Sequence, residues 1–392
     1  MELSARVQRI KPSPTLAITA RAAQLKAEGK NIIGFGAGEP DFNTPDHIKA
    51  AAIEAINAGF TKYTAVAGTL ALREAVAEKF LRDNQLEYTP EQILVSVGGK
   101  QSFYNLAQAL LNPGDEVIIP APYWVSYPDM VLLAEGTPVI VSSGLEQGFK
   151  ITPTQLEAAI TPKTRLMVIN SPSNPTGAAY SHAELAALGE VLRKYPHVIV
   201  ASDDIYEHIG WSAEPFKNIL TVNPDLYERA IVLNGVSKAY SMTGWRIGYA
   251  GGPLPLINAM KKIQSQSTSN PTSISQVAAQ AALEGDQTFI QQMNVEFKKR
   301  HDFIVGALNQ IEGVECLASD GAFYAFPKME AAYSKLEGIK NDVDFGEYLI
   351  NEAGVALVPG SAFGAPGYMR LSFATTMDNL KDGVARIQKA LK

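Results

Sequence analysis

Short apolar runs alternate with longer amphipathic stretches over roughly the first three quarters of the chain. Several of the short runs are apolar at nearly every position, which is typical of strands buried on both faces of a sheet. The seven runs that we interpret as strands are QILVSV, EVIIP, PVIVS, RLMVIN, HVIVASDD, AIVLNG and IGYAGG. Because strands that alternate with helices build parallel sheets, the pattern predicts an α/β fold with a mostly parallel, seven-stranded sheet.

Between these runs, apolar residues recur at every third or fourth position, as they do on one face of a helix. The clearest helical stretches are PDHIKAAAIEAINAG, TLALREAVAEKFLRDN and KQSFYNLAQALLN, the last of which ends before the Pro-Gly of NPGDEV. The segment that precedes them lacks this periodicity. We therefore expect the chain to begin with an irregular N-terminal arm.

From about Gln287 the pattern changes to one long helix followed by short strands and a closing helix. The long helix is FIQQMNVEFKKRHDFIVGALNQI, the strands are GAFYAFP, VALVPG and YMRLSFA, and the last helix is NLKDGVARIQKALK. A chain of 392 residues also exceeds the roughly 250–300 residues that one core supports. We predict a large α/β domain over 48–286 and a smaller α+β domain made of 1–47 together with 287–392.

Composition narrows the classes of function. The net charge is −6 with acids and bases interspersed, so a nucleic-acid partner is not expected. No segment approaches the roughly 18 consecutive apolar residues of a membrane span. A single cysteine, Cys316, excludes an internal disulfide, and the five histidines lack the spacing of a metal site. These features predict a cytoplasmic protein without a metal, whose partners are small molecules.

Residues with candidate chemistry follow several of the predicted strands, where open α/β sheets bind their ligands. ILVSVGGKQ is a strand, a Gly-Gly turn and a helix start, so its free N–H groups suit a phosphate, although an ordinary tight turn is the more common explanation of such a segment taken alone. Tyr123 and Trp124 follow the strand EVII, and either ligand stacking or core packing accounts for them. Asn174, in NSPSNPTG, either forms a plain turn or donates its amide to a ligand.

Two further strand ends carry ionisable groups. Asp203 and Tyr206 follow HVIVAS, where the acid either caps a turn or keeps an aromatic ring nitrogen protonated. Lys238 lies among small residues after AIVLNG, and Arg246 follows eight positions later. Most lysines are solvated surface charges, but a lysine at a buried strand end has a depressed pKa and can attack an aldehyde.

Taken together, these residues resemble the aspartate aminotransferase family of class I, fold-type I pyridoxal-phosphate enzymes, and within it the bacterial branch that includes aspartate/prephenate aminotransferases. The resemblance covers almost the whole chain. The ten motifs that carry it, in the family's order, are GAGEPDF, TKYT, GGKQ, PYWVSYP, NSPSNPTG, SDDIYEH, SKAYSMTGWRIGYAGGP, GAFY, VPG and MRLSFA. One such motif is weak evidence, whereas the series is specific.

The resemblance implies roles for the residues around the ring of pyridoxal 5'-phosphate. Lys238 would hold the coenzyme as a Schiff base and transfer the proton during catalysis. Asp203 would pair with the pyridine nitrogen, while Tyr206 and Asn174 would bond the phenolic oxygen and Trp124 would stack on the ring. Trp124 and Asn174 would also contact the substrate.

At the phosphate, the resemblance implies contacts from the backbone of Gly99 and Lys100 and from Arg246, a bidentate partner. Tyr63, in TKYT, would reach the phosphate of the neighbouring subunit. The resemblance therefore implies a homodimer with shared active sites.

The substrates implied are amino acids and 2-oxo acids. Arg370 would bind the α-carboxylate with help from the backbone of Gly38, and Lys100 would bind the distal carboxylate of an acidic substrate. Transamination between L-aspartate and 2-oxoglutarate in a ping-pong mechanism is the function we expect. Lys11 resembles a position linked to prephenate in this branch, which keeps a glutamate- or aspartate-dependent prephenate aminotransferase as the alternative. Aromatic or alanine aminotransferases, and a lyase or decarboxylase on the same scaffold, are further alternatives.

Two positions depart from the family's pattern. Asp204 replaces a glutamate found in many relatives, so we expect it not to be essential. Gly235 stands where a serine is common, which leaves Ser237 as a weak substitute for a phosphate contact. A regulator that only senses the coenzyme is disfavoured, because neither end of the chain offers a DNA-binding segment.

Overall fold

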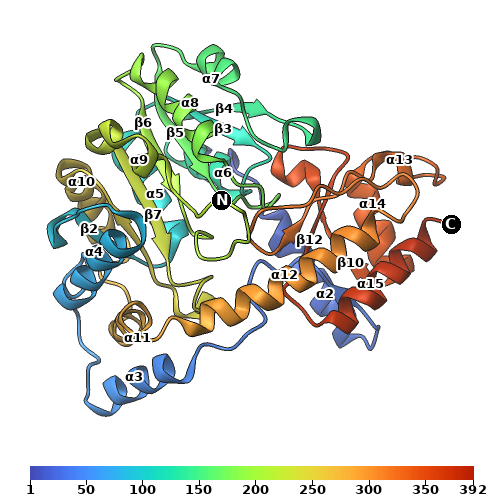
Figure 1. The fold of residues 1–392 in the computed structure, drawn as a ribbon, viewed down its shortest axis with the longest axis horizontal. Helices are drawn as coiled ribbons and strands as arrows, with labels where there is room; N and C mark the ends of the chain where they lie inside the picture. The colour runs from blue at the N-terminus through green and yellow to red at the C-terminus, as the bar shows by residue number, and fades with distance from the viewer.

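A seven-stranded sheet lies at the centre of the larger part of the molecule (Figure 1). The structure is a computed structural model that describes residues 1–392. The strand order is β2-β8-β7-β6-β5-β3-β4, and only β8 runs against the others. Its strands are β2 (Ile93–Ser96), β3 (Glu116–Ala121), β4 (Thr137–Ser142), β5 (Thr164–Asn170), β6 (Ile199–Asp203), β7 (Ala230–Gly235) and β8 (Gly248–Gly251). The predicted α/β fold and its mostly parallel sheet are confirmed.

Helices cover both faces of this sheet, which explains why its strands are apolar at successive positions. In β7, Ile231 and Leu233 pack into the core on one face and Val232 into the core on the other. The first core contains α5 (Gly99–Leu110), α6 (Ser126–Leu133) and α10 (Leu254–Ser265). The second core contains α3 (Asp46–Asn57), α4 (Leu70–Asn84), α7 (Pro153–Ala159), α8 (His182–Arg193), α9 (Ile219–Val222) and α11 (Ser273–Glu284).

The remaining strands form two small sheets on the other side of the molecule. β1 (Ile33–Gly34) pairs in parallel with β10 (Val355–Ala356). In the second sheet, β12 (Met369–Ser372) lies antiparallel between β11 (Val358–Pro359) and β9 (Tyr324–Ala325). Three helices pack with them, α13 (Glu330–Tyr333), α14 (Asp342–Tyr348) and α15 (Met377–Ala390), while α12 (Thr288–Leu308) leads from the larger part into this one (Figure 1).

The pairing of β1 with β10 joins the start of the chain to its C-terminal third. One core cluster there combines Ile33 and Phe35 with residues of α12, β12 and α15. This packing supports the division of the chain into 48–286 and 1–47 with 287–392, which stays a prediction. No helix has both the length and the apolar character needed to cross a membrane.

The expectation of an irregular N-terminal arm is wrong. The arm contains α1 (Ala5–Gln8) and α2 (Pro14–Ala27), and Ser13 caps α2 by accepting a hydrogen bond from the N–H of Leu16 at 3.5 Å. Only Ala22 and Leu25 of α2 are buried. With so few buried positions, the helix leaves little apolar periodicity in the sequence.

Candidate active site

A cavity of about 420 Å³ opens at the carboxyl ends of the central strands, between them and the smaller part of the molecule. Its walls include residues that follow β3, β5, β6 and β7, together with residues of α2, β9 and β12. Ten of the predicted site residues line it, namely Gly38, Gly99, Lys100, Trp124, Asn174, Asp203, Tyr206, Lys238, Arg246 and Arg370. The structure thus gathers residues that lie up to 332 positions apart in the sequence (370 minus 38).

Lys238 lies in the loop after β7, and its Nζ donates a hydrogen bond to the carbonyl of Gly38 at 2.5 Å. Burial, followed by the nearby charge of Arg370, lowers the pKa of Lys238 to about 8. A larger fraction of this side chain is therefore the neutral amine than for a lysine in water. A neutral amine is the form that attacks a carbonyl carbon.

Asp203 is the last residue of β6 and lines the cavity. Its carboxylate accepts a short hydrogen bond from the hydroxyl of Tyr127 and another from the N–H of Ile205 at 3.3 Å. Burial raises the pKa of Asp203 to about 6, against the lowering effect of those two donors and of Lys238. The group is thus ionised at neutral pH and can keep a cationic ring nitrogen protonated.

The turn between β2 and α5 is shaped for an anion. Gly98 has a φ of +83°, and a Cβ added to it would lie 2.4 Å from the guanidinium of Arg246. The first N–H groups of α5, beginning at Gly99, have no acceptor within the helix. Arg246 donates to the carbonyls of Thr243 at 2.9 Å and Val97 at 3.4 Å, which keeps its charge beside these groups. Backbone donors and an arginine in this arrangement suit a phosphate.

Lys100 extends into the cavity beside the aromatic residue that follows β3. Its Nζ lies 5.3 Å from the centroid of the Trp124 ring. Burial lowers the pKa of Lys100, and the charge of Arg246 contributes to the same shift. An anionic group bound here would stabilise the ammonium that burial disfavours.

Arg370, on β12, is 2% exposed and is held from several sides. It donates to the Oδ1 of Asn174 at 2.9 Å and to the carbonyl of Gly36 at 2.7 Å, while its Nε has no partner. Its guanidinium lies 4.6 Å from the ring centroid of Tyr324 and 5.0 Å from that of Phe363. Each of its two terminal nitrogens keeps a second N–H, and these are the donors that a carboxylate in the cavity would accept from.

Tyr206 follows β6 and is also buried. Its hydroxyl lies 2.8 Å from the hydroxyl of Tyr324, and its ring centroid lies 5.8 Å from the Nζ of Lys238. Burial, followed by the proximity of Tyr324, raises the pKa of Tyr206 well above its ordinary value. The phenol therefore keeps a proton that it can donate.

Two predicted site residues lie outside the cavity. Tyr63 is 91% exposed. Lys11 lines a neighbouring cavity of about 700 Å³, where Asp129 also lies, and Val125 contributes to both cavities. The structure does not bring Lys11 to the residues around Lys238, and its role in binding substrate stays a prediction.

Several residues in or beside the cavity were missed by the sequence analysis. Tyr324, in the GAFY motif, lines the cavity, and Tyr127, in PYWVSYP, contacts Asp203 from outside it, but the partners of their hydroxyls are distant in the sequence and left no signal. Ser13, the N-cap of the unexpected helix α2, and Thr19 within that helix also line the cavity. Glu39, in GAGEPDF, is a further wall residue.

The departures from the family's pattern have structural explanations. A Cβ on Gly235 would lie 2.9 Å from the carbonyl of Ile247, so a serine does not fit this backbone, and Ser237 lines the cavity instead. Asp204 is buried outside the cavity, where it accepts hydrogen bonds from Ser202 at 2.6 Å and Asn218 at 3.0 Å. The expectation that Asp204 is not essential stays a prediction.

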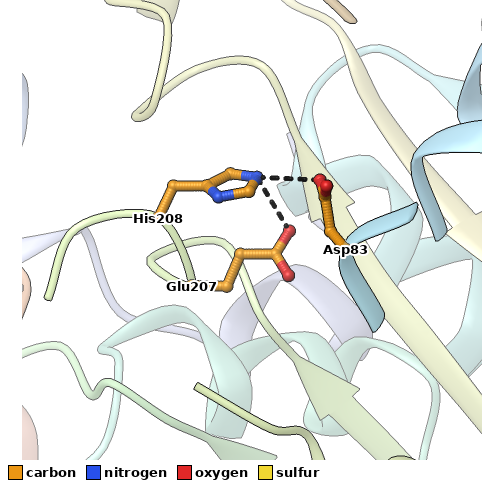
Figure 2. Close-up of side chains that lie close together, drawn as sticks. All are labelled: Asp83, Glu207 and His208. Atoms are coloured by element: carbon orange, nitrogen blue, oxygen red, sulfur yellow. Dashed lines mark ion pairs between the residues drawn. The ribbon is translucent and has the colours of Figure 1, made fainter. Parts of the chain in front are cut away.

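A second group of ionisable side chains lies outside the cavity. The Nε2 of His208 is 3.3 Å from Asp83 and 3.5 Å from Glu207 (Figure 2), so the three residues offer the ligand types of a metal site. The ammonium of Lys79, which is fully buried, pairs with Glu207 directly. Because a cation already neutralises Glu207, we interpret this group as an ion cluster that joins α4 to the turn after β6.

Comparisons with known proteins agree with this geometry. The family described as aminotransferase class I and II matches residues 30–387. The chain is 63% identical to the aspartate/prephenate aminotransferase of Nitrosomonas europaea, with 100% of each chain covered, and 56% identical to that of Cereibacter sphaeroides, with 98% of each covered. Among solved structures, aspartate aminotransferase from Rhizobium meliloti has a TM-score of 0.96 at 49% identity, covering 100% of this chain and 99% of that one. The Thermus thermophilus enzyme with maleate has a TM-score of 0.94 at 43% identity, with 100% of both covered.

Proposed function

Because the chain belongs to the class I and II aminotransferases, which use pyridoxal phosphate, we propose that it transfers amino groups between L-aspartate and 2-oxoglutarate. The observation that carries this proposal is the convergence of Lys238, Asp203 and Arg370 on one cavity. These groups are an amine of lowered pKa, a half-buried carboxylate and a buried guanidinium.

The residues present fit the coenzyme. Gly99, Lys100 and Arg246 would hold its phosphate, and Asp203 would hold the pyridine nitrogen in its protonated form. When bound, pyridoxal phosphate supplies an aldehyde that reacts with amines and a ring that withdraws electrons from the substrate's Cα. Trp124, whose indole lies edge-on to Tyr127 with ring centroids 5.1 Å apart, is the residue we assign to stack on that ring.

Two residues of the cavity retain donors for the phenolic oxygen. Asn174 accepts from Arg370 through its Oδ1, which leaves its amide N–H groups free to donate. Tyr206 is protonated and buried at the same cavity. Both residues thus retain the type of group that the proposal requires.

Lys238 would move the proton in each half-reaction. Its Nζ would take the proton from the substrate Cα and return it as a general acid, after the amino acid has displaced it from the coenzyme. The carbonyl of Gly38 orients this amine, and burial, followed by the charge of Arg370, lowers its pKa to about 8. Because the first 2-oxo acid leaves before the second one binds, the kinetics should be ping-pong.

For the substrate, Arg370 would bind the α-carboxylate through the N–H groups of its two terminal nitrogens that Asn174 and Gly36 leave free. Lys100 is an exposed lysine at the wall of the same cavity and has no carboxylate partner in the protein, and it would bind the distal carboxylate of aspartate. These two positive charges in one cavity support a dicarboxylic substrate.

Prephenate is the second candidate substrate. The relatives from Nitrosomonas europaea and Cereibacter sphaeroides bear the name aspartate/prephenate aminotransferase, and they share 63% and 56% of their residues with this chain. In addition, the neighbouring cavity that contains Lys11 shares Val125 with the proposed active site. Room and positive charge beside the cavity support a second, larger acceptor.

The assembly we propose is a homodimer in which Tyr63 reaches the phosphate of the other subunit. Tyr63 is 91% exposed, and apolar residues near it on α3 and in the following loop, Ile53, Ile56 and Phe60, are exposed as well. A second copy of the chain would bury these side chains.

Half-reaction spectroscopy tests the proposed activity. L-aspartate, L-glutamate, phenylalanine and alanine are added singly to the enzyme loaded with coenzyme, and the coenzyme's absorbance is followed. Aspartate and glutamate should convert the coenzyme fully to its amine form. Lys100→Ala should slow the reaction with both of these amino acids, while the reaction with phenylalanine and the binding of the coenzyme should stay unaffected. Conversion by alanine alone, or an equal loss for all substrates in Lys100→Ala, would contradict the substrate assignment.

A further inference from the structure

Tyr324 occupies a position that links three of the groups described above. It lies on β9, opposite Ser372 of β12, and Arg370 is two residues earlier on β12. Residues two apart on a strand share one face, so the diagonal neighbours Tyr324 and Arg370 are in contact, with 4.6 Å between the guanidinium carbon and the ring centroid. With Phe363 on the other side, the ring of Tyr324 fixes the plane in which Arg370 lies.

The hydroxyl of Tyr324 is buried and has one hydrogen-bond partner, the hydroxyl of Tyr206 at 2.8 Å. Each phenol carries a single proton. When the hydroxyl of Tyr206 donates its hydrogen bond to an oxygen of a ligand in the cavity, its own oxygen can only accept a hydrogen bond. The hydroxyl of Tyr324 is then the donor to Tyr206. The pair then forms a directed chain of two hydrogen bonds that strengthen each other.

Close packing keeps that hydroxyl in place. A Cβ on Gly38 would lie 3.1 Å from the Tyr324 hydroxyl oxygen, and the carbonyl of Gly38 accepts from Lys238. The hydroxyl of Tyr324 is therefore packed against the backbone that orients the reactive amine.

We propose that Tyr324 is a positioning residue with two separable roles. Its hydroxyl orients Tyr206 as a donor to the phenolic oxygen of the coenzyme, and its ring orients Arg370 toward the substrate carboxylate. This inference rests on the function proposed above.

The two roles predict different defects. Tyr324→Phe removes the hydroxyl alone, so the donor to the phenolic oxygen weakens and that oxygen becomes more basic. The pH midpoint of the bound coenzyme's absorbance should rise by about one unit and kcat should fall about tenfold. The dissociation constant of maleate, an unreactive dicarboxylate, should stay within about twofold.

Tyr324→Leu also removes the ring, so the dissociation constant of maleate should rise about tenfold.

Tyr88→Phe is the matched control, because it removes a buried phenolic oxygen that has no partner and lies outside the cavity. It should leave both readouts at the values of the unchanged enzyme. A double-mutant cycle with Tyr206→Phe separates positioning from a general effect on the fold. If Tyr324 acts through Tyr206, adding Tyr324→Phe to Tyr206→Phe should cost less than about twofold in kcat.

The inference is overturned if Tyr324→Phe leaves the pH midpoint and kcat unchanged, or if its effect is fully additive with that of Tyr206→Phe. If Tyr324→Phe does not fold while Tyr88→Phe and Tyr206→Phe do, the residue is structural and the inference is also overturned. If the enzyme without substitutions binds the coenzyme but does not react with aspartate, the proposed function is contradicted instead. The pH midpoint of the bound coenzyme's absorbance would still test the role of Tyr324.

Discussion

Arg370 shows how neighbouring groups fix one charged side chain in the wall of the cavity. Most buried polar atoms in proteins have partners, yet its Nε has none although the rest of the guanidinium is bonded and flanked by aromatic rings. The bonds to Asn174 and Gly36 fix the position of the guanidinium in the cavity wall. We assign the remaining N–H groups of its two terminal nitrogens to the substrate.

Arg370→Lys should consequently lower kcat/KM for aspartate by about two orders of magnitude, because an ammonium cannot reproduce a bidentate contact worth about 2–3 kcal/mol. Steady-state kinetics measure the effect. Arg386→Lys, at a helix surface where Asp382 is the partner, is the control and should retain normal kinetics. Equal losses in both variants would contradict the assignment.

Lys238 gives a prediction about pH. Its pKa is lowered to about 8, first by burial, and the neutral amine is the form that reacts with the aldehyde. Covalent uptake of pyridoxal phosphate by the apoenzyme should therefore speed up with rising pH and level off above about 8. Stopped-flow absorbance measures the rate, and Lys238→Ala should show no covalent uptake. A rate that keeps rising to pH 10, as for an ordinary lysine of pKa about 10.4, would contradict the lowered value.

At the scale of elements, the turn from β2 into α5 depends on a glycine for two reasons. Gly98 has a left-handed φ, and it also leaves the space that the guanidinium of Arg246 fills. The sequence motif GGKQ indicates the turn, but only the structure shows that Arg246, far along the chain, occupies that space.

Gly98→Ala should raise the dissociation constant of the coenzyme by about tenfold to a hundredfold, since displacing Arg246 weakens a charge-assisted contact of about 1.5–3 kcal/mol. Equilibrium dialysis or fluorescence measures it. Gly59→Ala introduces the same backbone strain at a φ of +73° with nothing within 4 Å, and it should leave coenzyme binding unchanged. Weakened binding in Gly59→Ala to the same extent would point to backbone strain alone.

The ion cluster beside α4 predicts a stability effect. Lys79→Met leaves the buried carboxylate of Glu207 without its cation, and breaking a buried pair costs about 3–5 kcal/mol. Urea unfolding followed by circular dichroism should show a clear fall in the midpoint, with partial recovery in Lys79→Met/Glu207→Gln. Lys335→Met, in an exposed pair with Glu312, should leave the midpoint unchanged. No recovery in the double variant would argue against this explanation.

At the scale of the whole molecule, the sequence predicted the central sheet well because β7 and its neighbours are buried at nearly every position. It failed for α2, whose single buried turn leaves no strong period. It also missed Tyr324 and Tyr127, because their hydroxyl partners are 118 and 76 positions away and no local pattern encodes such pairs. The roles of the site residues and the two-domain division rest on the resemblance and on packing, and we propose them on that basis.

The proposed dimer makes a prediction that only shared sites can satisfy. A dimer of Lys238→Ala and a dimer of Tyr63→Ala should each be weakly active or inactive. After subunit exchange, the hybrid contains one site with both residues intact, so activity should reappear, reaching about a quarter of the normal value for random mixing. The transamination rate after mixing measures the recovery, and sedimentation verifies that dimers are present. No recovery in a verified hybrid would show that Tyr63 does not act across the interface.

The most direct test of the account follows the amino group itself. The enzyme is incubated with pyridoxal phosphate, L-aspartate labelled with ¹⁵N and unlabelled 2-oxoglutarate, and the products are analysed by mass spectrometry. We expect the label to move to glutamate with release of the matching 2-oxo acid, and Lys238→Ala to abolish this transfer. Label that remains in aspartate, or that leaves as ammonia or in a decarboxylated amine, would contradict an aminotransferase that acts through Lys238.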